Sequence, residues 1–148
     1  MTDMNMIKLS SDTGQKVSEI IAGIADGVQI IPERVAVLTL SDKDRVSTLL
    51  SEADVAVADY ELRQLVDPSV RLVTFSRNNT SADVTSLNLQ QRETCRSFEV
   101  LSGSSMGRVY VPYSCNYSMD QILIAVAVMC ALGAALDDIL TSLNGFLK

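Results

Sequence analysis

The spacing of hydrophobic residues along the chain predicts alternating helices and strands. Residues 15–25 place apolar side chains three or four positions apart, which is typical of an amphipathic helix. Residues 34–40, 54–59 and 70–76 are short runs rich in β-branched residues and closed by polar clusters, as expected of buried parallel strands. Short helical segments are expected between these strands, at residues 45–52 and 61–66. The order indicates βαβ units.

The pattern of apolar and polar residues changes after residue 81. Residues 83–90, 96–101 and 107–113 alternate apolar and polar positions over strand lengths and are separated by turn-prone segments, so an antiparallel three-stranded meander is expected. Two helices are predicted to follow, at residues 119–132 and 136–143. The fold class is therefore α/β, with a short, mainly parallel sheet, flanking helices, a small meander and two C-terminal helices.

The length of 148 residues, of which 47% are hydrophobic, suits one domain with a sizeable core. Within this single domain, residues 11–81 are expected to form the α/β part, 82–114 the meander and 117–147 the C-terminal helices. Residues 1–10 are expected to be flexible.

Composition and charge exclude several functions. The formal net charge of -6 argues against a nucleic-acid partner, because neutralising phosphates requires clustered Lys and Arg. The chain has no histidine, which removes Ser-His-Asp and Cys-His catalysis and His-ligated zinc. Its three cysteines form no CxxC pattern and imply no disulfide framework. We expect no metal site.

The chain shows no signal-peptide pattern at residues 1–8. The uncharged run 122–136 is fifteen residues long, shorter than the roughly 18 to 20 that a bilayer span requires. We interpret this run as a buried core helix. A cytoplasmic protein without a membrane partner is expected.

Several segments, taken in order, resemble the Mur ligase family. Residues 16–27 (KVSEIIAGIADG) and 35–38 (VAVL) resemble the family segment K-x-E-I-x-x-G-L-x-x-G-x-x-V-L-N-x-D-D. The strings VTFS, SADV, NL and SFEV, between residues 73 and 100, follow the family's succession into its small hairpin region. Residues 132–139 (LGAALDDI) resemble its closing helix pair, most like the member that adds D-alanyl-D-alanine to UDP-N-acetylmuramoyl-tripeptide.

The resemblance covers residues 16–146 and implies the second half of the family's central ATP-binding domain. The family catalyses ATP-dependent amide ligation in peptidoglycan precursor synthesis, with ATP and Mg²⁺. Its phosphate-binding GxxGKT[ST] loop has no counterpart in the sequence, because no glycine is followed by Lys-Ser or Lys-Thr. We expect no cofactor for this chain and no ligase activity from it alone.

Residues that the resemblance places at the nucleotide and metal site have also changed. The family motif G-x-H-N-x-x-N-A falls on residues 115–122, where Tyr117 replaces the His, Ser118 the first Asn and Gln121 the second. A phenol and a hydroxyl do not reproduce the donor and acceptor geometry of an imidazole and a carboxamide. The family's N-x-D-D falls on residues 39–42, so that Thr39 takes the place of the Asn and Asp42 keeps one acid. These five positions are expected to be a degenerate site.

Other polar residues have simpler interpretations. Lys16 lies within one residue of the family's metal-bridging lysine, but a solvated helix lysine is the preferred interpretation. Asp137 and Asp138 open a predicted helix, where acids complement the helix dipole. Asp42 and Asp59 follow or end strands, where ligands of open α/β sheets bind, so they are a candidate ligand site.

Three functions remain open: a non-catalytic Mur-ligase-like domain with a scaffolding or regulatory role or as a remnant, half of a split ligase, and a small-molecule binding module. The first is preferred because it explains both the missing loop and the changed motif. The expected partner is a second copy of the chain or a P-loop-containing ligase half, because an unpaired edge of a parallel sheet promotes association.

Overall fold

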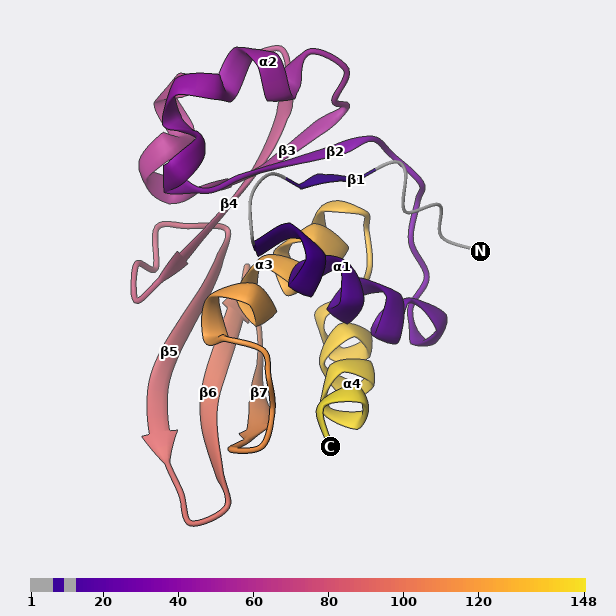
Figure 1. Ribbon diagram of the computed structural model, residues 1–148, viewed down its shortest axis with the longest axis vertical. Helices are drawn as coiled ribbons and strands as arrows, with labels where there is room; N and C mark the ends of the chain where they lie inside the picture. The colour runs from indigo at the N-terminus through magenta and orange to yellow at the C-terminus, as the bar shows by residue number, and fades with distance from the viewer. Residues whose placement is uncertain (1–6, 10–12) are drawn as a thin grey trace.

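The structure, a computed structural model, describes residues 7–9 and 13–148. Within these residues one mixed sheet of seven strands is formed, with the strands side by side in chain order (Figure 1). The strands are β1 (Ile7–Leu9), β2 (Val35–Leu38), β3 (Val55–Asp59), β4 (Arg71–Arg77), β5 (Val84–Gln91), β6 (Cys95–Ser102) and β7 (Ser105–Pro112). Strands β1 to β5 pair in parallel, and β5 to β7 pair antiparallel. The predicted α/β class with an antiparallel meander is confirmed.

The alternation of side chains along β2 and β3 separates two cores. Val35 and Val37, in register with Val55 and Val57, point into the larger core. The residues between them are mostly alanines, and they contribute to a smaller core on the opposite face. Because alanine is small, the short helical segments on that face can lie close to the sheet.

The helices divide between the two faces of the sheet (Figure 1). The larger core is covered by α1 (Thr13–Ile24), which leads into η2 (Ala25–Gly27), and by α3 (Met119–Ala131) and α4 (Leu136–Leu147). The smaller core is covered by η3 (Leu40–Arg45), α2 (Val46–Leu50) and η4 (Tyr60–Leu65). The apolar run predicted as a core helix is α3, and nearly all of its side chains are buried. None of the helices that the structure describes is long and apolar enough to span a membrane.

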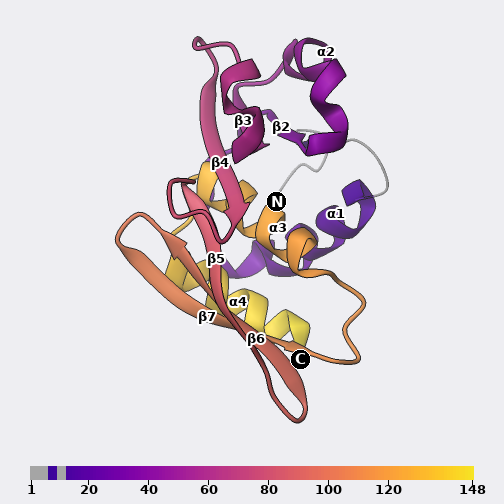
Figure 2. The same cartoon turned by 90° about the vertical axis from the view of Figure 1, so that its left-hand side faces the viewer.

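The meander continues the parallel sheet without a break. Strand β5 pairs with only the last three residues of β4, and its first residue, Val84, lies opposite Phe75. The chain therefore has to run back only a short way along β4 between the two strands, and a short connection joins them although they are parallel. Asn78 accommodates this connection with a positive φ of 69°, and its N–H donates to the Ser86 carbonyl at 2.9 Å. The antiparallel strands β5 to β7 extend beyond the parallel part, and α4 packs across β7 (Figure 2).

Strand β1 was not predicted from the sequence. It contains three residues and becomes a strand only by pairing with β2, which no local pattern indicates. The expected flexibility of residues 1–10 falls, apart from β1, on residues outside the described part of the chain.

The free edge of β7 is occupied by one side chain of α4. The Tyr110 N–H donates to the Asn144 Oδ1 at 3.0 Å, and the Asn144 Nδ2 donates to the Arg108 carbonyl at 3.0 Å. The carboxamide therefore takes the place that the backbone of an eighth strand would fill, and it satisfies one donor and one acceptor of the edge.

Replacing Asn144 by alanine is expected to lower the free energy of unfolding by about 1–2 kcal/mol, because two hydrogen bonds to the β7 edge, one of them partly buried, are lost. Urea titration of both proteins measures the difference. Asn116→Ala is the matched control, because Asn116 is exposed and makes no hydrogen bond to any residue in the described part of the chain. Equal losses in the two variants would contradict the role given to Asn144.

Candidate functional site

A cavity of about 470 Å³ lies where the parallel strands β2, β3 and β4 end. Ligands of open α/β sheets bind beyond the carboxyl ends of the strands, which is the edge where this cavity is found. Its lining residues are Thr39, Leu40, Ser41, Asp59, Glu61, Phe75, Ser76, Arg77, Asp120, Leu123 and Ile124. The loops after the strands and the first turns of α3 together form the cavity wall.

Of the two acids predicted as a ligand site, Asp59 lines the cavity and Asp42 does not. The Asp42 carboxylate is fully buried. It accepts hydrogen bonds from the Thr39 N–H at 2.8 Å and from the Thr39 hydroxyl at 3.1 Å. Its other oxygen accepts from the Arg45 guanidinium at 2.9 Å. Asp42 and Thr39 therefore hold together the first turn of η3, and Thr39 also contributes to the cavity wall.

Asp59 is half-buried at the end of β3. Its Oδ1 accepts the Glu61 N–H at 3.0 Å and so caps η4. Burial raises the pKa of the Asp59 carboxyl above its ordinary value of 3.8. The hydrogen bond from Glu61 opposes this rise in pKa, while the negative charges of Glu61 and Asp120 add to it.

Several lining residues were not identified from the sequence. Ser76 and Arg77 end β4 just as Asp59 ends β3, so the same strand-end argument could have found them. Asp120 belongs to α3, and its side chain lies 3.7 Å from that of Arg77. No local signal places α3 across the ends of the strands, so Asp120 could be found only from the folded chain.

The three replaced motif positions lie together at the beginning of α3 and are not among the residues that line the cavity. The Ser118 hydroxyl accepts the Gln121 N–H at 3.1 Å, and the Gln121 side-chain carbonyl accepts the Ser118 N–H at 2.9 Å. These two reciprocal hydrogen bonds are a capping box, which satisfies N–H groups at the start of the helix. Ser118 and Gln121 thus have a defined structural role.

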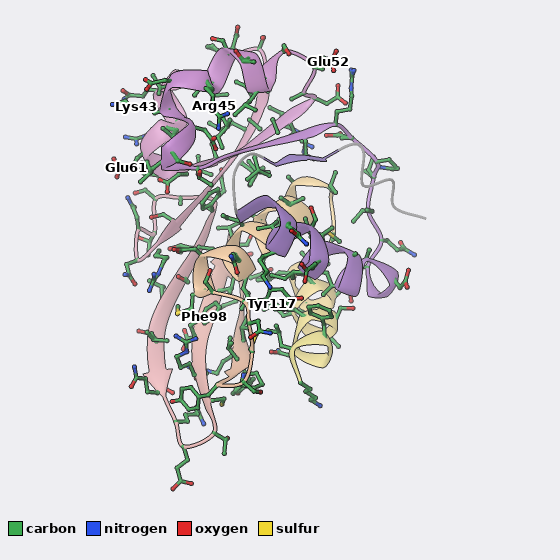
Figure 3. All side chains as sticks on the ribbon, in the orientation of Figure 1. Lys43, Arg45, Glu52, Glu61, Phe98 and Tyr117 are labelled. Atoms are coloured by element: carbon green, nitrogen blue, oxygen red, sulfur yellow. The ribbon has the colours of Figure 1, made fainter. Side chains whose placement is uncertain are left out.

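Tyr117 connects three elements (Figure 3). Its hydroxyl donates to the Glu19 carboxylate of α1 at 3.0 Å, and its ring lies 5.7 Å from that of Phe146 in α4. The ammonium of Lys16 lies 5.5 Å from the centre of the Tyr117 ring, within the range of a cation–π contact. Burial raises the pKa of the Tyr117 phenol, and the hydrogen bond to Glu19 and its charge raise it further. Lys16 therefore lies against an aromatic ring.

Two other observations limit what the described residues can bind. They contain no group of three or more Cys, Asp or Glu side chains that could hold a metal ion. A second cavity, of about 520 Å³, lies between α2 and η4 at the opposite ends of β3 and β4. Its two carboxylates already have partners: Asp54 pairs with Arg34 at 3.4 Å and accepts the Arg34 N–H at 2.9 Å, and Asp67 accepts the N–H and the hydroxyl of Ser69. The cavity at the carboxyl ends of the strands is the better candidate site.

Neither a protein-family model nor a curated protein matches the sequence. Among solved structures, a UDP-N-acetylmuramoyl-L-alanyl-D-glutamate–2,6-diaminopimelate ligase is similar to 77% of the chain, with a TM-score of 0.60 and 16% identity. A murein peptide ligase from Psychrobacter arcticus is similar to 78% of it, with a TM-score of 0.53 and 16% identity. The chain covers 28% and 27% of these two proteins. It therefore has the fold of the Mur ligase central domain.

The similarities to solved structures do not identify which Mur ligase this chain resembles most. The D-alanyl-D-alanyl ligase from Acinetobacter baumannii matches 77% of the chain at 20% identity, and the chain covers 22% of it, but the TM-score is 0.48. That score is too low to support the particular resemblance noted in the sequence, which stays a prediction.

Replacing Ser118 by alanine should lower the free energy of unfolding by about 1 kcal/mol, because the capping box loses its hydroxyl acceptor. Thermal or urea unfolding measures this loss. Ser114→Ala is the control, since Ser114 is exposed and its hydroxyl has no hydrogen-bond partner among the described residues. A Ser118→Ala protein as stable as the control would show that the box contributes little.

The raised pKa of Asp59 predicts a pH dependence of stability. An acid whose pKa is higher in the folded state binds more protons there, so unfolding becomes easier as pH rises from about 4 through the folded pKa. Asp59→Asn keeps a capping carbonyl and removes this titration. The free energy of unfolding of Asp59→Asn minus that of the wild type should therefore increase as the pH rises from about 4 through the folded pKa. A decrease over that interval would contradict the burial of this carboxyl.

Proposed function

We propose that this chain is a Mur-ligase-like domain that does not catalyse ligation by itself and acts as a scaffolding or regulatory module. The observation that supports this proposal is that the side chains at the replaced motif positions form hydrogen bonds and ring contacts within the fold. Ser118 and Gln121 cap α3, and Tyr117 joins α1 to α4. None of the three offers the imidazole or short carboxamide that the family resemblance places at these positions.

The other replaced position supports the same proposal. Thr39 stands where the family resemblance places an Asn, and its N–H and hydroxyl both donate to Asp42. Asp42 is the one acid retained from that motif. Its carboxylate is thereby engaged in hydrogen bonds within η3, and Arg45 neutralises its charge. Neither residue is arranged to receive a nucleotide.

A small-molecule binding module is a second candidate function, favoured by the cavity at the carboxyl ends of β2 to β4. Its volume of about 470 Å³ lies within the range of small-molecule sites. The two candidates are compatible, since a domain without ligase chemistry can still respond to a ligand.

The non-catalytic proposal predicts that MgATP leaves the unfolding temperature of the chain unchanged. A ligand present at 100 times its dissociation constant would stabilise the protein by about 2.7 kcal/mol, which a thermal shift measures easily. Stabilisation by MgATP, or ATP hydrolysis by the isolated chain, would contradict the proposal. Hydrolysis that arises only after mixing with a P-loop-containing ligase half would favour the split-ligase alternative.

A further inference from the structure

The cavity at the carboxyl ends of β2 to β4 has an apolar floor. Phe75 comes from β4, and Leu123 and Ile124 come from the second turn of α3. All three side chains are buried in the fold, with exposed fractions of 6%, 1% and 3%. These side chains are held rigidly by the core but leave little surface open to a ligand. The exposed apolar surface of the lining comes from Leu40, of which 56% is exposed, and this surface favours an apolar body.

The rim of the cavity is negatively charged. Asp59, Glu61 and Asp120 bring three carboxylates, while Arg77 brings the one cationic group among the lining residues. That guanidinium lies 3.7 Å from the Asp120 carboxylate and is therefore already partly neutralised. The field over the cavity attracts cations and repels phosphates and carboxylates.

Asp59 is the half-buried acid of the rim, and it retains binding capacity. Its Oδ1 accepts the Glu61 N–H, whereas its Oδ2 receives no hydrogen bond from the residues that the structure describes. Asp59 also forms no ion pair within that part of the chain, although it is half-buried. A partly desolvated carboxylate with a free oxygen gains more from a cation than an exposed one does.

The neutral groups of the rim are compatible with a cationic head group. The Thr39 hydroxyl donates to Asp42, so the Ser41 hydroxyl, 2.8 Å from it, donates to Thr39 and keeps its own lone pairs for a ligand. The Ser76 hydroxyl donates to the Arg77 carbonyl at 3.2 Å and keeps its acceptor capacity. The rim thus offers acceptors beside the Asp59 carboxylate.

We propose that this cavity binds a primary ammonium ion carried on a small apolar body, with the ammonium at Asp59 and the body against Leu40 and Phe75. The proposal rests on the second candidate function and names the ligand class of that site. It predicts selectivity for organic cations over neutral and anionic molecules of the same shape.

A matched series of probes tests this selectivity. The ¹⁵N–¹H spectrum of the full chain is titrated at pH 7 with 2-phenylethylamine, 2-phenylethanol and phenylacetate, which share a phenyl group but differ in charge. The amine is expected to shift the amides of residues 39–41, 59–61, 75–77 and 120–124, and to bind at least about tenfold more tightly than the alcohol, a difference of about 1.4 kcal/mol. Phenylacetate is expected to bind most weakly.

Two variants locate the charge that is responsible. Asp59→Asn should reduce the affinity for the amine about tenfold, to the level of the alcohol, and leave the affinity for the alcohol unchanged. Asp54→Asn is the matched control, because Asp54 lies before β3, pairs with Arg34 and does not line this cavity, so both affinities should stay as in the wild type. The dispersed spectrum of each variant shows whether it is folded.

The possible failures are distinguishable. Equal affinity for the amine and the alcohol, with shifts around the cavity, would overturn the cation preference and leave the binding module in place. No shift with any of the three probes would overturn both. An amine affinity that Asp59→Asn does not reduce would overturn the role of Asp59. The non-catalytic proposal is tested separately, by MgATP.

Discussion

The rest of the fold depends on the burial of α3 between the sheet and the helices α1 and α4. This helix is apolar on all sides because it meets β2 to β5 on one side and the two helices on the other. A helix without a polar face gains its stability from tertiary packing, and its position is fixed by the elements around it. Because α3 crosses the ends of the parallel strands, it also supplies the floor of the cavity through Leu123 and Ile124.

Burying such a helix requires that the donors at its first turn be satisfied. Ser118 and Gln121 meet that requirement through the capping box, and Tyr117 fixes the preceding loop to Glu19 and Phe146. The same three positions are those where the family resemblance places a nucleotide and metal site. At these three positions the side chains of this chain hold the start of α3 in place.

Most of the fold could be predicted because its elements carry local patterns. The valine and alanine runs of β2 and β3, the apolar spacing of α1 and the uncharged length of α3 each indicate their structure without reference to the rest. Strand β1 and the joining of the meander to the parallel sheet could not be predicted, since both depend on pairing between distant segments. The bonds of Asn144 to the β7 edge likewise have no local signature.

The candidate site was only partly predictable for the same reason. Asp42 follows a strand and Asp59 ends one, but Arg45 and Thr39 bind the buried Asp42, while Asp59 lines the cavity and has one oxygen without a hydrogen bond from the described residues. The central claim is that the motif positions now serve the packing of α3. The most direct measurement is the free energy of unfolding of the triple variant Tyr117→His, Ser118→Asn, Gln121→Asn, which restores the family's residues. A loss of about 1–2 kcal/mol is predicted, because the hydrogen bond from Tyr117 to Glu19 and the bond from the backbone N–H of residue 118 to the Gln121 side chain are broken. Undiminished stability would contradict the claim.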